Sequence, residues 1–229
     1  MTVDSIDPAQ FTPSEYSAMI VRHLMAESGV ARDATVCDIG TGSGILAQTA
    51  LKLGASHAVA TDIDPDALAV ARHALADTAP GSRWDLRAGS IWQAIALDET
   101  FDLVVANLPN FPGASFRPGN RSPHWASGGA DGRQFVDPFL DGLAARLNPG
   151  GRAVFTQNRC IGLQRTLDRL AGDGLSASVR DIVLVAMGPE KCDALDPDAA
   201  RAEGFVRVGR HVFLEVCLIG AEKPRSLIS

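Results

Sequence analysis

The chain has 229 residues, of which 46% are hydrophobic and 21% are charged, a composition that is typical of a folded globular protein and excludes a disordered one. Its formal net charge of −6 at pH 7, without any Lys/Arg run, argues against a protein that holds nucleic acid through phosphate contacts. One hydrophobic core suits this length, so we predict a single domain over residues 1–229.

The N-terminal tail, residues 1–10, is polar and lacks the basic start and the apolar stretch of a signal peptide. No apolar run approaches the roughly 18 to 20 residues that span a bilayer. The four cysteines are widely separated, with no CxxC pair and no histidine at zinc-ligand spacing. These features predict a cytoplasmic protein with reduced cysteines, no membrane partner and no metal, and they leave its oligomeric state open.

Helical and strand patterns alternate along the first half of the chain. Thr12, followed by Pro13, predicts the start of a first helix that runs to about Gly29. A strand, a glycine-rich turn and a helix follow over 35–53, and the pattern repeats over 58–75 with Asp64 as the helix cap. Strands that alternate with helices of this length predict a parallel sheet with covered faces.

Further strands are expected at 84–87, 101–106, 152–157, 177–186 and 211–219, and further helices at 133–147 and 161–171. Two stretches fit no element. Residues 108–132 are rich in Gly and Pro yet carry aromatic side chains, and residues 187–210 form an insertion before the last strand. Because long loops in compact domains are usually functional, we interpret 108–132 as a substrate loop.

A glycine cluster follows the first expected strand, with Gly40, Gly42 and Gly44 at G-x-G-x-G spacing at the start of a helix. Backbone N–H groups and the helix dipole favour an anionic group there, and the missing side chains allow close approach. Asp62 ends the next strand about 20 residues on, where its oxygens could accept hydrogen bonds from both hydroxyls of a ribose. A tight turn alone would also explain the glycines, but together with Asp62 they predict a nucleoside-containing cofactor.

Two cofactors fit this pair, a nicotinamide dinucleotide and S-adenosylmethionine. The dinucleotide fingerprint places its third glycine three residues after the second, whereas Gly44 comes two residues after Gly42. The spacing therefore favours S-adenosylmethionine.

The stretches Val36–Ala47 and Ala60–Leu68 resemble the cofactor half of class I S-adenosylmethionine-dependent methyltransferases. Within that class they are most similar to the ribosomal protein L11 methyltransferases and the release-factor glutamine methyltransferases, over about residues 11–157. The expected fold is accordingly an α/β fold: a doubly wound, Rossmann-like sheet of seven mostly parallel strands with the last strand antiparallel.

The resemblance also implies roles for individual residues. The glycine loop contacts the methionine portion of the cofactor, Ile63 lies against the adenine, and Asp38 orients the loop and the methionine ammonium. Ser90 stands where the family usually has an acid that accepts from the adenine amino group, a bond that a hydroxyl makes more weakly. The predicted cofactor-binding residues are Asp38, Gly40, Thr41, Gly42, Gly44, Asp62, Ile63, Ser90, Ile91 and Asn107.

The fourth expected strand ends in Asn107-Leu108-Pro109-Asn110, where glutamine and adenine amino-methyltransferases have Asn/Asp-Pro-Pro-aromatic. In that motif the Asn side-chain oxygen and a backbone carbonyl accept the two N–H protons of an amide and hold its nitrogen in line with the methyl group. Asn107 and Pro109 match and are predicted to be catalytic. Asn110 does not match, which argues against a planar amide substrate, and Phe111 either supplies the ring or anchors the loop.

The remaining acceptor-binding candidates come from the first helix and from the substrate loop. Glu15 and Tyr16 stand where the release-factor enzymes have a Pro- and Glu-containing segment over the cofactor, although Glu15 could equally complete a capping box. Arg117 and Arg121 offer positive charge for an anionic substrate, unless they are merely solvated. The predicted acceptor-binding residues are Glu15, Tyr16, Asn110, Phe111, Arg117 and Arg121.

The sequence thus predicts in-line methyl transfer from S-adenosylmethionine to a nitrogen or oxygen atom. About ten residues before the first helix cannot form the additional N-terminal domain with which both families grip protein targets, so we expect a small-molecule acceptor. A protein amide or amine is the alternative. A lyase or cyclase that consumes S-adenosylmethionine, and a binding module without turnover, also remain open.

Overall fold

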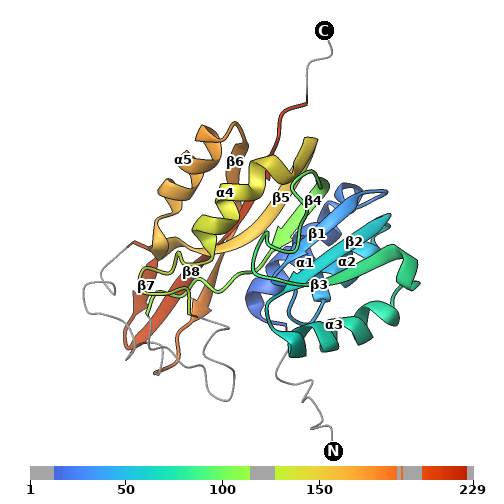
Figure 1. Cartoon of the computed structure of the whole chain (residues 1–229). Coiled ribbons are helices and arrows are strands. Elements are labelled where there is room, and N and C mark those ends of the chain that lie inside the picture. The colour runs from blue at the N-terminus through green and yellow to red at the C-terminus, as the bar shows by residue number, and fades with distance from the viewer. Residues whose placement is uncertain (1–12, 114–126, 190–191, 193–202, 226–229) are drawn as a thin grey trace, which may run out of the picture. The chain divides into compact units, whose positions relative to one another are not determined.

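A computed structural model of the chain describes residues 13–113, 127–189, 192 and 203–225 (Figure 1). The chain divides into two compact units, Met1–Ala106 and Asn107–Ser229, which we call unit 1 and unit 2 and describe separately. The single domain expected from the sequence stays a prediction.

Unit 1 contains four strands that pair with one another in parallel. Its strands are β1 (Thr35–Ile39), β2 (His57–Asp62), β3 (Trp84–Ala88) and β4 (Phe101–Ala106). β1 pairs with β2 on one side and with β4 on the other, and β3 pairs with the outer side of β2. Because all four strands are parallel, their carboxyl ends meet at one edge, where Asp62 is in register with Ala88. This edge carries the glycine cluster.

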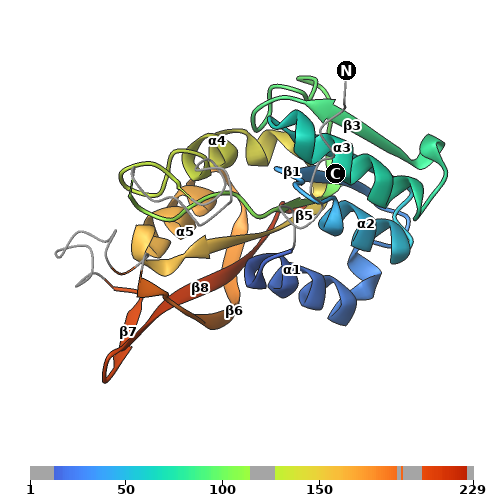
Figure 2. The same ribbon diagram turned by 90° about the horizontal axis from the view of Figure 1, so that it is seen from below.

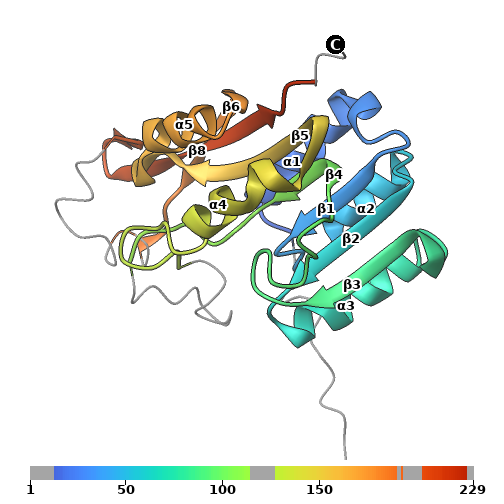
Figure 3. The same ribbon diagram turned by 45° about the horizontal axis from the view of Figure 1, so that its top comes forward.

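Three helices accompany this sheet: α1 (Glu15–Ala26), α2 (Ile45–Lys52) and α3 (Pro65–Ala76), with short 3₁₀ turns at Ser28–Val30 and Gly81–Arg83. Figure 3 shows α2 and α3 on the same face of β1, β2 and β3. The predicted start of the first helix at Thr12 and Pro13 is wrong, because the N-cap is Ser14, whose hydroxyl accepts from the Ser17 N–H. The cap predicted at Asp64 is confirmed, since its carboxylate accepts from the Asp66 N–H.

Unit 2 is built from α4 (Val136–Arg146), β5 (Leu147–Asn158), a 3₁₀ turn (Arg159–Ile161), α5 (Leu163–Gly172), β6 (Ser176–Ala186), β7 (Phe205–Val208) and β8 (His211–Glu222). β8 lies between β5 and β6 and is antiparallel to both. α4 and α5 lie on one face of these strands (Figure 2). The predicted α/β class, with parallel early strands and an antiparallel last strand, is confirmed.

Two strands of unit 2 differ from the sequence-based expectation. β7, inside the predicted insertion 187–210, forms a hairpin with the start of β8. Its four residues are too few to show the alternation of apolar and polar side chains that marks a strand in a sequence. β5 begins at Leu147 rather than at Arg152, because the Gly150 N–H donates to the Lys223 carbonyl and the Lys223 N–H to the Gly151 carbonyl. Tertiary pairing thus extends the strand through a segment that reads locally as a turn.

Gly132 shows how tightly unit 2 packs around the start of α4. Its φ is +77°, and a Cβ atom there would lie 2.4 Å from Ile161 Cγ2 and 2.9 Å from the Asn110 carbonyl oxygen. Gly174 has nearly the same φ, +79°, but nothing lies within 4 Å of its Cβ position. The two sites therefore separate the cost of the backbone conformation from the cost of the close contact.

We expect Gly174→Ala to lower the free energy of unfolding by ~1–2 kcal/mol through the left-handed backbone alone. Gly132→Ala should lose a further ~1–3 kcal/mol, because the new methyl group overpacks a filled site. Urea unfolding of both variants measures the difference. Equal losses would show that the contact at Ile161 relaxes freely.

Candidate cofactor and acceptor sites

The loop between β1 and α2 is shaped by glycines in the left-handed region, with φ of +71° at Gly40, +54° at Gly42 and +81° at Gly44. At Gly44 a Cβ atom would lie 3.1 Å from Cα and Cβ of Ala71, so the packing of α3 also requires a small residue there. At Gly42 nothing lies within 4 Å of the Cβ position. The backbone at Gly42 therefore borders open space that a bound group can occupy.

The side chain of Asp38, on β1, is hydrogen-bonded to this loop and to α2. Its Oδ2 accepts a hydrogen bond from the Thr41 hydroxyl (2.7 Å) and from the Ala47 N–H in the first turn of α2 (3.1 Å). The side chain is fully buried, and Oδ1 has no hydrogen-bond partner. Burial raises the pKa of Asp38 to about 7, although the bonds from Thr41 and Ala47 oppose that shift. A cation brought to this loop would favour the ionised form.

Asp62, the last residue of β2, joins two loops through its carboxylate. Oδ2 accepts from the Gly42 N–H (2.9 Å) and Oδ1 from the Asp64 N–H (3.0 Å). Burial raises the pKa of Asp62, and these two backbone bonds oppose the rise. A carboxylate has about four acceptor positions, so acceptor capacity remains for a ribose hydroxyl.

Ile63 follows Asp62 and is 70% exposed, one of the large apolar side chains that unit 1 leaves open to solvent. An apolar surface beside a polar acceptor suits an adenine ring next to a ribose. The glycine loop, Asp62 and Ile63 together fit an adenine nucleoside with a charged tail, which is the chemical character of S-adenosylmethionine.

The loop after β3 carries Ser90 and Ile91. The Gly89 N–H donates to the Asp62 carbonyl oxygen (2.9 Å), so this loop is tied to the same residue. Ile91 has φ of +50°, and among the described non-glycine residues only Asp33 shares a positive φ. Aspartate tolerates that region, but for a β-branched residue it costs on the order of 1–3 kcal/mol. Nothing in the sequence reveals this strain.

The segment Asn107–Asn110 in unit 2 is hydrogen-bonded to residues of β5. The Thr156 hydroxyl donates to Asn107 Oδ1 (2.8 Å), and Asn107 is partly exposed. Asn110 is 3% exposed. Its Oδ1 accepts from the Asn158 N–H (2.9 Å), and its backbone carbonyl accepts from Asn158 Nδ2 (3.0 Å). Its Nδ2 donates to the Leu108 carbonyl (2.8 Å). These bonds make Asn110 an internal anchor of the segment; its predicted contact with an acceptor stays a prediction.

Phe111 is also buried, in a cluster with Leu214 that Cys160, Met187 and Phe205 border. This placement favours its interpretation as a loop anchor. Pro109 is half-buried between the two asparagines. Arg117 and Arg121 lie outside the described residues.

On α1, Glu15 is exposed and Tyr16 is half-buried, and their predicted contacts with an acceptor likewise stay predictions. Glu15 does not complete a capping box, because with Ser14 as N-cap the third helical residue is Ser17.

In the part of the chain that the structure describes, no three His, Cys, Asp or Glu side chains are grouped so that they could hold a metal ion. Nor do the described helices include one with the length and apolarity needed to cross a membrane.

Comparison with known proteins places these residues in a family context. Residues 19–109 match the family model for ribosomal protein L11 methyltransferase. A release factor glutamine methyltransferase from Cereibacter sphaeroides is 37% identical over 161 residues, covering 67% of this chain and 54% of that protein. A ribosomal protein L11 methyltransferase from Xanthomonas axonopodis pv. citri is 37% identical over 142 residues, 61% of this chain and 38% of that protein.

Among solved structures, a chain of the E. cuniculi Mtq2–Trm112 complex has 19% identity and a TM-score of 0.57, with 93% of this chain and 98% of that chain aligned. Such a match shows a shared fold. The chain belongs to the class I S-adenosylmethionine-dependent methyltransferases. It spans about half the length, or less, of the curated methyltransferases that it matches.

The buried carboxyl group of Asp38 gives a test by pH. Its carboxyl group ionises near 3.8 when unfolded and near 7 when folded, so between these values the native state holds the extra proton. Stability due to Asp38 is then fully present below about pH 4 and is lost as the pH rises through 7.

Between pH 4 and 7, Asp38 should make the free energy of unfolding of the wild type fall by up to about 1.4 kcal/mol per pH unit. We expect Asp38→Asn to remove this contribution. Urea unfolding of the wild type and the variant at several pH values measures it, with the exposed Asp98→Asn as the control. Parallel stability curves for Asp38→Asn and the wild type would contradict the shift.

Proposed function

We propose that the chain transfers the methyl group of S-adenosylmethionine to a nitrogen atom of a protein. The single observation that supports cofactor binding is the hydrogen bond from the Gly42 N–H to Asp62 Oδ2, which joins the glycine loop to the predicted ribose acceptor. The similarity to L11 and release-factor methyltransferases supports a protein as the methyl acceptor.

When bound, the cofactor would supply a methyl group on a positively charged sulfur, and this sulfur is the leaving group when a nucleophile attacks the methyl carbon. The residues of unit 1 bind and orient this group: the open backbone at Gly42 admits the methionine portion, Asp62 accepts from the ribose, and Ile63 covers the adenine. The buried Asp38 carboxylate supports the loop and favours a nearby cation. None of these residues needs to transfer a proton.

Asn107 is proposed to orient the acceptor nitrogen. Its Oδ1 accepts from the Thr156 hydroxyl, and an amide oxygen can accept more than one hydrogen bond, so Oδ1 is proposed to accept an N–H bond from the acceptor as well. That bond would direct the nitrogen lone pair toward the methyl carbon, so that the N–C bond forms as the C–S bond breaks and the nitrogen then releases a proton to water. Such a reaction depends on alignment more than on an acid and a base.

A protein acceptor replaces the small molecule expected from the sequence. That expectation rested on the lack of a separate domain for gripping a protein. The E. cuniculi chain aligns over 98% of its length with this one, and its complex methylates a translation termination factor. The curated relatives, a release factor glutamine methyltransferase and ribosomal protein L11 methyltransferases, favour a protein acceptor.

Cofactor binding gives the first test of the proposed function. We expect S-adenosylhomocysteine to bind, and Asp62→Asn to weaken it by ~1–3 kcal/mol, because the amide nitrogen cannot accept from a ribose hydroxyl or from Gly42. Isothermal titration calorimetry measures both affinities. Asp64→Asn is the matched control, because asparagine also caps helices and the charge change is the same. Binding of a dinucleotide in place of S-adenosylhomocysteine would overturn the assignment.

The second prediction concerns the acceptor. With methyl-tritiated S-adenosylmethionine and purified bacterial release factor or ribosomal protein L11, we expect label in the protein fraction and S-adenosylhomocysteine as product. Asn107→Ala should lower kcat by about 10²-fold or more while changing cofactor affinity little, since its role is alignment. The exposed Gln164→Ala is the control.

Equal loss of binding and turnover in Asn107→Ala would instead assign Asn107 to the cofactor pocket. A thioadenosine product without transfer would indicate a lyase or cyclase, and label confined to small molecules would restore the small-molecule acceptor.

A further inference from the structure

Arg87 and Glu99 form an ion pair that closes the loop carrying Ser90 and Ile91. Arg87 Nη1 donates to Glu99 Oε2 (2.7 Å) and Nη2 to Oε1 (3.0 Å), so the contact is bidentate. Arg87 lies on β3, and the partners are separated by twelve residues. Such paired bonds fix geometry as well as supplying attraction. The ion pair therefore joins the two ends of the loop.

Further bonds make the loop a compact unit around this pair. Arg87 Nη1 also donates to the Ala94 carbonyl (3.3 Å), and Glu99 Oε2 accepts from the Ala96 N–H (3.3 Å). A Cβ atom at Gly89 would lie 2.9 Å from Ala94 Cβ, so the loop turns back closely on its own start. The ion pair is thus bonded to the backbone of the loop as well.

Ile91 lies inside this closed loop with its φ of +50°. A β-branched residue persists in that conformation only where its surroundings hold it there. Released from the restraint, it would return to negative φ and its side chain would change direction. The start of the loop is bonded to Asp62 through Gly89, so the strained residue lies in the part of unit 1 assigned to the nucleoside.

We propose that the Arg87–Glu99 ion pair holds Ile91 in its left-handed conformation and thereby sets the affinity of unit 1 for the adenosine end of the cofactor. The inference rests on the proposed function in one respect, that unit 1 binds S-adenosylmethionine. Arg87 and Glu99 are positioning residues, since their polar atoms contact the protein and act on the cofactor through Ile91.

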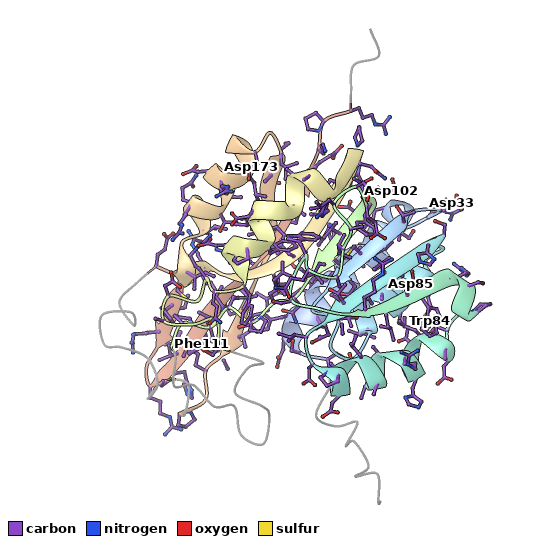
Figure 4. The ribbon with its side chains drawn as sticks, in the orientation of Figure 1. Asp33, Trp84, Asp85, Asp102, Phe111 and Asp173 are labelled. Carbon is purple, nitrogen blue, oxygen red and sulfur yellow. The ribbon has the colours of Figure 1, made fainter. Side chains whose placement is uncertain are left out.

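Asp85 provides a matched control. Its Oδ2 accepts from Arg87 Nη2 at 3.2 Å, but it lies two residues before Arg87 on the same strand (Figure 4), so this bond spans no loop. Asp85→Asn and Glu99→Gln each remove one negative charge from the surroundings of Arg87. They differ in whether the loop loses its closure.

The test is calorimetric titration with S-adenosylhomocysteine. If the opened loop spends about a tenth of its time in the competent conformation, Glu99→Gln weakens binding about tenfold, because apparent affinity scales with that fraction. Asp85→Asn should stay within about twofold of the wild type. Melting temperatures confirm that the titrated variants are folded. Equal effects of the two variants would overturn the proposal.

A second comparison isolates the strain at Ile91. Glycine adopts positive φ without cost, so in the Ile91→Gly background Glu99→Gln should weaken binding by less than about twofold relative to Ile91→Gly alone. The same loss in both backgrounds would show that the ion pair acts independently of the conformation of residue 91, and would overturn the proposal.

Hydrogen exchange gives a readout that does not need the ligand. Backbone amides of residues 89–98 should exchange faster in Glu99→Gln than in the wild type and Asp85→Asn. Failure of the wild type to bind S-adenosylhomocysteine would contradict the proposed function, whereas unchanged exchange in Glu99→Gln would contradict the ion pair as the restraint.

Discussion

The candidate cofactor site depends on the carboxylate of Asp62 and its bond from the Gly42 N–H. β1 and β2 are adjacent and parallel, so the loops that follow them begin side by side, with Ile39 in register with Thr61. The N–H groups of Gly40 and Thr41 both donate to the Thr61 carbonyl, which fixes the start of the glycine loop. Asp62 then fixes its middle. A half-buried carboxylate with acceptor capacity to spare is thereby presented where a ribose is expected.

Asp38 complements Asp62 at the other end of the glycine loop. Gly44, the N-cap of α2, has no side chain to accept from the first turn, and Asp38 supplies that acceptor from β1 through the Ala47 N–H. The loop can therefore be made of glycines while the Ala47 N–H, in the first turn of the helix, still has a hydrogen-bond acceptor. The consequence is a buried carboxyl group whose pKa is raised by burial, which couples the stability of the loop to pH and to any bound cation.

In unit 2, the segment Asn107–Asn110 differs from the methyltransferase motif at its last position, and the structure gives the consequence. Asn110 is turned inward and bonded to Asn158, while Thr156, two residues earlier on the same face of β5, bonds to Asn107. An aromatic ring at position 110 could not accept from the Asn158 N–H as Asn110 Oδ1 does. The segment is therefore held by polar contacts to β5, and Asn107 remains partly exposed for an acceptor.

The sequence by itself determined the order of helices and strands in unit 1 and the features of the cofactor site that are local. Alternating apolar runs, the G-x-G-x-G spacing and the Asp64-Pro65 cap depend on neighbouring residues, and these patterns are readable without a fold. The same holds for the approximate places of β5, β6 and β8. The roles of the site residues toward ligands remain proposals.

Only the tertiary structure decided the features that join distant segments. The extension of β5 to Leu147 and the hairpin of β7 depend on pairing with β8, which no local pattern encodes. The burial of Asn110 depends on Asn158, and the left-handed conformation of Ile91 goes against the preference of its own side chain. The strand pairings and the burial of Asn110 are imposed by contacts between residues far apart in the chain, so their physical cause lies outside the local sequence.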